Sequence, residues 1–418
     1  MSDKPMVRSA VKCRSLTYSD IFHPSSEYIN ENRVDYFIIQ DMLSFGRNTE
    51  FYFGNLNVLI GPNGSGKSNL IDCLKVMQSL PFDISRNFKN TQLEDWIYKG
   101  DDQSIRLPQL SISVSIKNIG KVEHQISFIN SQYNKIFIEE VILDNEGELE
   151  IPYFINNSES RPKIAYFDQR RNRREREFSG TFNSSQSVLN QVRDTEQYPE
   201  LSSLARFYSS MQFYSEWTFG RRSSLRNSSS INNPEDFLNE SMDNLPLVLN
   251  SLRETESHDL IRKYLNDLKE SYRDYFTTVR FGQVVLEIIE SGLMSRIPAQ
   301  RLSDGTLRFL ALATILLNKN LPSVICLEEP ELGMHPDMIR MISRMIIEAS
   351  KKSQIFVTTH SELLLTSLQG DLDQLFVFTS GPDGSSVRSF ERDDFSEWLT
   401  KNQLGDLWSN GELGGNRW

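Results

Sequence analysis

The stretch LIGPNGSGKSNL, residues 59–70, fits the pattern G-x-x-x-x-G-K-[ST] without a gap. The apolar run LNVLIG (56–61) leads into it and predicts a short strand. Apolar residues at helical spacing follow it and predict a helix over about 67–80. A strand, a glycine loop and a helix in this order are the context in which the pattern forms a phosphate-binding loop.

The residue types of this loop suit the phosphates of a nucleotide. Gly61, Gly64 and Gly66 let the backbone bend and bring its N–H groups toward phosphate oxygens. The N-terminus of the following helix adds partial positive charge. Lys67 is placed to reach the β- and γ-phosphates, and the hydroxyl of Ser68 is placed to hold Mg²⁺.

A second stretch, SVICLEEPELGMHP (323–336), places two acids at the end of an apolar strand. In a doubly wound sheet, ligands bind at the carboxyl ends of the strands. Successive strand residues point in opposite directions. We therefore expect Glu328 and Glu329 to do different jobs, one toward the hydration shell of Mg²⁺ and one toward an attacking water.

Two further stretches carry candidate site residues. IFVTTHSELLL (355–365) reads as a strand followed by a helix, with His360 at the end of the strand. This histidine is either structural or, at the same sheet edge as the phosphate loop, a contact of the γ-phosphate. RLSDGTLRFLALATILL (301–317) reads as an amphipathic helix. Its first turn holds capping and permissive residues: Ser303, Asp304 and Gly305.

The composition of the 418-residue chain is that of a soluble globular protein, with a formal net charge of −11. Any nucleic-acid contact therefore needs a local basic patch. Cys13, Cys73 and Cys326 are far apart, which argues against a structural zinc site and against a disulfide framework. The polar N-terminus and the lack of a long apolar run predict no signal peptide and no membrane span, hence a cytoplasmic protein.

Periodicity along the chain predicts an α/β segment at each end and a different middle. Residues 109–156 alternate like antiparallel hairpins, and residues 199–217 and 234–275 have helical periodicity. Residues 281–291 return to a strand, and strands and helices alternate from 301 onward. The arrangement suggests one domain whose sequence is split by an insertion.

These motifs, in this order, resemble the ABC-type ATPase heads of the SMC, RecF and OLD-like group. GPNGSGKSN is similar to the Walker A motif of the group, and LSDGT (302–306) to its signature. CLEEP (326–330) is similar to Walker B, and TTHS (358–361) to the switch histidine. EEPELGMHP and the tail 404–418 look like stand-alone prokaryotic ATPases, many of which sit in anti-phage or toxin–antitoxin operons.

The resemblance covers roughly residues 30–80 and 281–418. It implies an α/β fold: a P-loop ABC-type ATPase head, with a mixed or parallel sheet and flanking helices, split by a large β-hairpin plus helical insertion. The expected parts are an N-terminal lobe with Walker A over 1–82, an inserted β-rich then helical region over 83–280, and a C-terminal lobe over 281–418 with the other motifs.

In that group two heads sandwich two ATP molecules, and the signature of one head completes the site of the other. The implied nucleotide-binding residues are Gly61, Asn63, Gly64, Ser65, Gly66, Lys67, Ser68 and Asn69. The implied residues acting in the partner head are Ser303, Asp304 and Gly305. Glu329 is then the catalytic acid that polarises water, Glu328 binds Mg²⁺ through water while Ser68 holds it through its hydroxyl, and His360 senses the γ-phosphate.

The sequence departs from the group at several positions. Glu328 stands where Asp is common in Walker B. Asp304 and Thr306 replace the common Gly and Gln of the signature, a change expected to weaken or slow dimer closure. The glutamine of the Q-loop is either Gln169 or Gln186, two alternatives that the residues leave open. Arg47 is equally suited to contact nucleotide or solvent.

A basic stretch, RPKIAYFDQRRNRRER (161–176), carries seven Arg or Lys and two Asp or Glu. The interpretations are a nucleic-acid contact, a contact to an acidic partner protein, and a solvated charged face. The candidate contact residues are Arg170, Arg171, Arg173 and Arg174.

Two classes of function fit these features. The first is a nucleotide-driven dimeric switch that reports to an operon-encoded effector, a nuclease or toxin, in anti-phage defence. The alternative is a DNA repair or maintenance ATPase of RecF or SMC type that acts directly on DNA. About 58 residues follow His360, too few for the nuclease domain of OLD-type proteins, and no hook motif of the Rad type is present.

Overall fold

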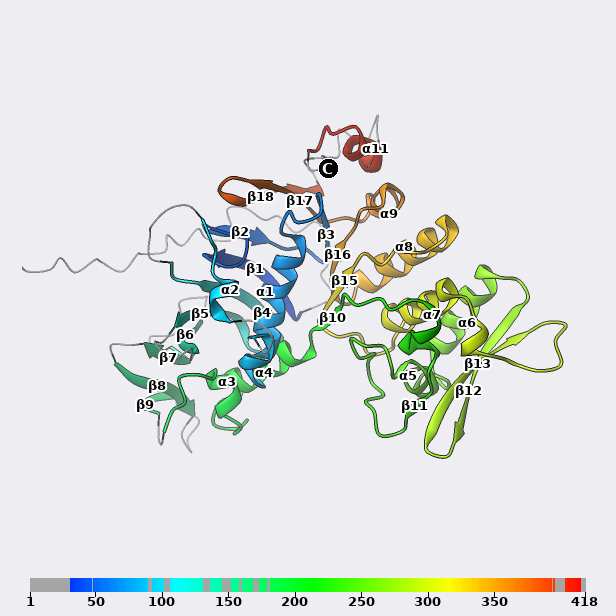
Figure 1. The fold of residues 1–418 in the computed structure, drawn as a ribbon. Helices are drawn as coiled ribbons and strands as arrows, with labels where there is room; N and C mark the ends of the chain where they lie inside the picture. The colour runs from blue at the N-terminus through cyan, green and yellow to red at the C-terminus, as the bar shows by residue number, and fades with distance from the viewer. Residues whose placement is uncertain are drawn as a thin grey trace, which may run out of the picture.

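The structure of the protein is a computed structural model. It describes residues 31–46, 48–88, 92–100, 106–130, 136–144, 152–157, 160–167, 173–178, 181–392, 394 and 403–414. These residues form three β-sheets with helices packed between and around them (Figure 1). Among the described residues, no helix has the length and apolar character needed to cross a membrane.

A six-stranded sheet lies at the centre of the molecule (Figure 1). Its strands, in spatial order, are β10 (Gln212–Tyr214), β15 (Val324–Glu328), β16 (Gln354–Thr358), β3 (Leu56–Ile60), β17 (Gln374–Gly381) and β18 (Gly384–Glu391). All neighbouring pairs are parallel except β17 and β18. Every residue of β3 and β16 is buried, as expected for parallel strands that are covered on both faces.

Alternate residues of these strands enter two different cores. Val58 of β3 packs with helices of the C-terminal half, whereas its neighbour Leu59 packs with α1. This period of two follows from the pleat of a strand.

Among the described residues, the α-helices are α1 (Lys67–Ser79), α2 (Leu93–Trp96), α3 (Val188–Gln191), α4 (Pro199–Ser210), α5 (Leu245–Ser251), α6 (Glu256–Leu268), α7 (Asp304–Leu316), α8 (Pro336–Ser350), α9 (Glu362–Leu368) and α11 (Leu404–Ser409).

An eight-stranded antiparallel sheet shares the core of α1 (Figure 1). Its strands, in order, are β2 (Thr49–Tyr52), β1 (Arg33–Gln40), β4 (Gln109–Ile116), β5 (Gly120–Asn130), β6 (Ile136–Asp144), β7 (Phe154–Asn157), β8 (Ser160–Phe167) and β9 (Arg173–Glu177). The hairpins expected over 109–156 are therefore present. The basic stretch also forms a hairpin, β8 and β9, because its charges pair across the strands, as between Lys163 and Glu175.

The third sheet belongs to a second lobe and contains β11 (Ser229–Ser230), β12 (Tyr272–Arg280), β13 (Gln283–Glu290) and β14 (Ile297–Pro298). The helical periodicity expected over 234–275 is only partly correct, because β12 begins at Tyr272. Aromatic and β-branched residues favour the strand. Phe281 and Gly282 both have positive φ, the conformation that a two-residue hairpin turn requires.

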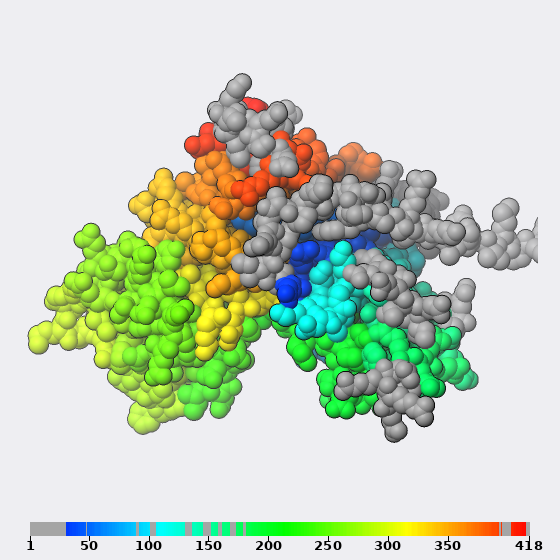
Figure 2. Space-filling model, turned by 180° about the vertical axis from the view of Figure 1, so that it is seen from behind, coloured from blue at the N-terminus to red at the C-terminus, as the bar shows by residue number. Residues whose placement is uncertain are grey.

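Strands from the middle of the sequence pair with strands from the N-terminal and C-terminal segments of the chain. β4 pairs with β1, and β10 pairs with the Walker B strand β15. The helix expected over 199–217 ends at Ser210 for this reason, and the chain enters the central sheet two residues later. The division at residues 82 and 280 stays a proposal about chain segments. Figure 2 shows a notch between the part of the surface coloured yellow-green to yellow and the part coloured cyan to green.

Candidate nucleotide-binding site

The phosphate loop lies between the carboxyl end of β3 and the start of α1. Gly61 has φ 146° and Gly66 has φ 107°, a backbone region that favours glycine. A Cβ at Gly61 would lie 2.4 Å from the carbonyl oxygen of Phe378, and one at Gly66 would lie 2.3 Å from Ser385 Oγ. Glycine is therefore required at both positions by conformation and by space.

The ammonium group of Lys67 lies against the loop. Its Nζ donates to the carbonyl oxygens of Gly61 at 2.7 Å and Pro62 at 2.9 Å. Burial lowers the pKa of Lys67 to about 8, against an opposing effect of Glu329 and Glu328. The site thus holds a cation whose charge is poorly neutralised by its surroundings, which suits a phosphate group.

Two serines outside the motif brace the loop. The hydroxyl of Ser385, on β18, donates to the carbonyl oxygen of Ser65 at 2.7 Å. The amide of Asn69 donates to Ser44 Oγ at 2.7 Å. Asn63 is exposed beside the loop, whereas the side chain of Ser65 is fully buried under it. Sequence analysis missed Ser44 and Ser385, because they lie far from the motif and carry no local pattern.

The Walker A and Walker B motifs meet at one hydrogen bond. Ser68 Oγ donates to Glu328 Oε2 at 2.7 Å. A hydroxyl and a carboxylate are the oxygen ligands that Mg²⁺ prefers, so these two side chains fit the ion that the sequence assigned to them. The carbonyl oxygen of Glu328 accepts a bond of 2.6 Å from the indole N–H of Trp217.

Glu329 leaves the strand in a left-handed conformation, with φ 45°. Its N–H donates to the carbonyl oxygen of Thr358 at 3.0 Å. Its Oε1 lies 3.6 Å from Nε2 of His360. The two carboxylates therefore contact different partners: Glu328 contacts Ser68, and Glu329 contacts His360. The left-handed backbone at Glu329 contributes to this difference, in addition to the alternation of side chains along the strand.

His360 follows β16 and faces the same sheet edge. The backbone N–H of His360 donates to Glu331 Oε1 at 3.0 Å. Burial is the main cause of a lowered His360 pKa, Lys67 adds to it, and Glu329 opposes it. The imidazole is therefore neutral near pH 7. Glu331 is itself partly buried, and this burial raises its pKa. Sequence analysis did not assign Glu331, although it follows the acidic pair directly after Pro330.

The signature residues lie at the start of α7. The hydroxyl of Ser303 caps the helix by accepting the N–H of Thr306 at 3.1 Å. The carboxylate of Asp304 accepts the N–H of Gly220 at 2.9 Å and forms an ion pair with Arg226. The bond from Arg226 is the main cause of a lowered Asp304 pKa. Asp304 is thus engaged within its own chain, beside Gly305.

A segment outside the motifs, residues 215–226, connects them. Trp217 reaches Walker B, as described above, and Phe219 packs over Gly333. Arg226 donates to the carbonyl oxygen of Leu302 at 2.7 Å and is 9% exposed. Only the aromatic residues in SEWTFG (215–220) hinted at this packing.

The basic stretch is described only in part. Arg170 and Arg171 lie outside the described residues, as do Gln169 and Arg47. Arg173 forms an ion pair with Glu200 and lies over the rings of Tyr153 and Phe167, at 4.6 and 5.3 Å from their centres: these contacts leave its side chain 15% exposed.

Arg174, another candidate contact residue of the basic stretch, lies on the exposed side of β9. Gln186 donates to Asp83 at 2.8 Å and is therefore not at the phosphate loop.

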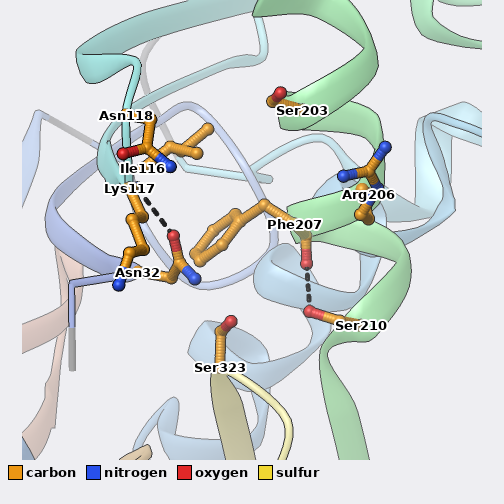
Figure 3. Close-up of a pocket in the computed structure, with 9 residues that line it drawn as sticks. All are labelled: Asn32, Ile116, Lys117, Asn118, Ser203, Arg206, Phe207, Ser210 and Ser323. Carbon is orange, nitrogen blue, oxygen red and sulfur yellow. Dashed lines mark hydrogen bonds between the residues drawn. The ribbon is translucent and has the colours of Figure 1, made fainter. Parts of the chain in front are cut away.

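A pocket of about 330 Å³ lies elsewhere in the molecule (Figure 3). Phe207 and Arg206 of α4 and Lys117 of the turn between β4 and β5 line it. Ser323, just before the amino end of β15, also lines it. The acids Glu328 and Glu329 follow the opposite end of the same strand, so this pocket is distinct from the phosphate loop.

Comparison with known proteins agrees with the geometry. Residues 56–366 match the family model described as "AAA domain, putative AbiEii toxin, Type IV TA system". The chain belongs to this family. The match of this AAA-domain family runs from β3 into α9 and so includes the motifs that form the site.

The curated relative is the chromosome partition protein Smc of Desulfitobacterium hafniense (strain Y51), 33% identical over 133 residues. These residues are 30% of this chain and 10% of the relative, so the chain spans about a tenth of that protein's length. An Smc head domain from Pyrococcus furiosus, solved with the C-terminal domain of ScpA, matches with a TM-score of 0.54 and 12% identity. The match covers 88% of this chain and 99% of that one. The expected SMC-like, P-loop α/β head fold is confirmed.

Proposed function

We propose that this member of the AAA-domain family binds ATP with Mg²⁺ and hydrolyses it as a dimeric switch. The observation that carries the proposal is the meeting of Ser68 with Glu328 at 2.7 Å, next to the contact of Glu329 with His360. A phosphate loop, a magnesium ligand pair and a candidate base thus share one sheet edge.

Each side chain has a defined part in this proposal. Lys67 and the backbone N–H groups of the loop hold the phosphates, and Ser68 with Glu328 holds the ion. When bound, Mg²⁺ neutralises phosphate charge. The carboxylate of Glu329 orients the attacking water and accepts its proton. The neutral imidazole of His360 donates a hydrogen bond to the γ-phosphate.

The place of the signature residues supports the proposed dimer. Ser303 and Gly305 stand at the start of α7, and Ser303 bonds within that helix start. In heads of this fold group, a second copy brings this helix to the γ-phosphate of the first. We propose the same ATP sandwich here, with hydrolysis resetting it.

The output of the switch is proposed to be a cytoplasmic effector, a nuclease or toxin encoded in the same operon, in an anti-phage system. The family description, which names a toxin of a toxin–antitoxin system, supports this. The alternative is direct action on DNA, which the similarity to an Smc protein favours. The pairing of Arg173 with Glu200 removes one of the cations that DNA binding would use.

One experiment separates these outcomes. The protein is purified together with its genomic neighbours, with and without ATP, and mass, partner and phosphate release are measured. ATP-dependent recovery of a neighbour with a dimer supports the switch. Salt-dependent binding of DNA by the isolated protein, without any neighbour, supports the alternative. Absence of ATP binding contradicts both.

A further inference from the structure

We propose that Arg308 is a positioning residue that holds the left-handed backbone of Glu329 and thereby aims its carboxylate. The inference rests on the proposed hydrolysis for its functional consequence, and on geometry alone for its structural part. Arg308 lies on α7, five positions after Ser303, and is 2% exposed.

Glu329 needs an external restraint. A side chain other than glycine in the left-handed region brings Cβ too close to the following carbonyl oxygen, so the conformation is unfavourable by itself. Such a conformation persists only where the surroundings over-determine it. Its N–H is held by the carbonyl oxygen of Thr358, at 3.0 Å, which fixes one side of the peptide backbone. Its carbonyl side requires a second restraint.

Arg308 supplies that restraint. One nitrogen of the guanidinium donates to the carbonyl oxygen of Glu329 at 2.6 Å, and the other donates to the carbonyl oxygen of Leu332. The N–H of Leu332 bonds back to the carbonyl oxygen of Glu329 at 3.1 Å. A rigid two-pronged donor thus clamps both ends of the turn after Walker B, which a lysine cannot do.

Aromatic rings fix the guanidinium in turn. It lies 4.1 Å from the ring centre of Trp217 and 5.2 Å from that of Phe219. The indole of Trp217 holds the carbonyl oxygen of Glu328. The carbonyl groups of the two consecutive acids are therefore held by two side chains that stack on each other.

The surroundings of Arg308 also indicate a role beyond stability. None of the ion pairs found among the described residues includes Arg308; its buried charge is compensated by two carbonyl groups, by aromatic rings and, at longer range, by the carboxylates of Glu331 and Glu329. Its direct hydrogen bonds therefore go to the backbone of the turn after Walker B and not to a carboxylate. Because Arg308 is on α7, it links the helix that bears the signature to the backbone of the catalytic acid.

The first test measures turnover and binding separately in Arg308→Lys. We expect ATP affinity to stay within about twofold, and kcat to fall by about 10- to 100-fold, since a small misplacement of a catalytic group is costly. Arg340→Lys, on the exposed side of α8, is the control and keeps wild-type kcat. Unchanged kcat in Arg308→Lys, or an equal loss of ATP affinity, overturns the proposal.

The second test does not depend on hydrolysis. Glycine adopts positive φ without strain, so the clamp matters less after Glu329→Gly. We expect Arg308→Lys to lower Tm by about 2–4 °C in the wild-type chain and by less than half of that in the Glu329→Gly chain. Equal shifts in both chains overturn the proposal. A wild-type protein that binds ATP without hydrolysing it contradicts the proposed function, and this cycle then decides on Arg308 alone.

Discussion

The hydroxyl of Ser68 donates to the carboxylate of Glu328 across 260 positions of sequence. The bond joins the first turn of α1 to the end of β15. It therefore connects two distant segments of the chain within the candidate site. Both side chains are oxygen ligands, and the carboxylate of Glu328 also interacts electrostatically with Lys67.

This pair predicts the magnesium dependence of the protein. Ser68→Ala and Glu328→Gln each remove one oxygen ligand or its charge, so the Mg²⁺ concentration for half-maximal ATP turnover is expected to rise about 10-fold or more. The measurement is a Mg²⁺ titration of phosphate release at saturating ATP. An unchanged midpoint in both variants would show that the ion is held elsewhere.

Replacement of the second acid separates binding from hydrolysis. Glu329→Gln keeps the shape of the side chain but cannot accept a proton, so ATP binding is expected to persist while turnover falls by about 10²- to 10⁴-fold. The variant is expected to stay a closed dimer with ATP, which light scattering after gel filtration measures. Hydrolysis at the wild-type rate contradicts the role given to Glu329.

Removal of the loop cation is expected to abolish useful nucleotide binding. Lys67→Ala loses a charge-assisted contact to phosphate, which lowers ATP affinity by about 10- to 100-fold. Lys99→Ala is the matched control, because Lys99 is an exposed lysine paired with Asp95. Equilibrium binding of a fluorescent ATP analogue measures both. Equal affinity in the two variants would remove Lys67 from the site.

The lowered pKa of Lys67 predicts a pH dependence of binding. Only the protonated lysine attracts phosphate, and its pKa of about 8 lies within the accessible range. As pH rises through this value the charge is lost, so the dissociation constant for ATP is expected to increase about fivefold between pH 8 and pH 9. Titration in Lys67→Arg, whose charge persists, is expected to remove this dependence. A flat profile in the wild type contradicts the assignment.

Asp304 is expected to matter for stability as well as for dimer closure. Asp304→Asn leaves the guanidinium of Arg226, which is 11% exposed, without its carboxylate, and Tm is expected to fall by about 2–4 °C. Asp337→Asn is the control: it breaks a pair with Arg340 in the first turn of α8 that is exposed on both sides. Thermal unfolding compares them, and equal Tm values contradict the prediction.

The central part of the site could be predicted from sequence because its chemistry is local. The glycine loop, the acidic pair and His360 each follow a buried strand, and the parallel pairing of β3, β16 and β15 brings them together at one edge. Such strands are recognisable as short apolar runs. Element boundaries around the motifs are close to those expected, as for the helix predicted over about 67–80, which the structure shows as α1 at Lys67–Ser79.

The remainder depends on contacts that no local pattern records. Trp217 lies at the end of the range expected to be helical, and Arg226 carries no local pattern, yet tertiary hydrogen bonds hold both against the motifs. β10 was missed because three residues are too few for periodicity. Arg308 reads as one polar position of an amphipathic helix, and only the fold reveals the strained residue that it holds.

The order of strands in the central sheet sets when the site can exist during synthesis. β3 pairs on one side with β16 and on the other with β17, both of which are synthesised long after β3. Until then the emerging chain exposes two open edges of an apolar strand, a template for aggregation. Nascent chains therefore have a glycine loop without a finished sheet to support it, and the capacity to bind a nucleotide arises only once β16 and β17 have left the ribosome.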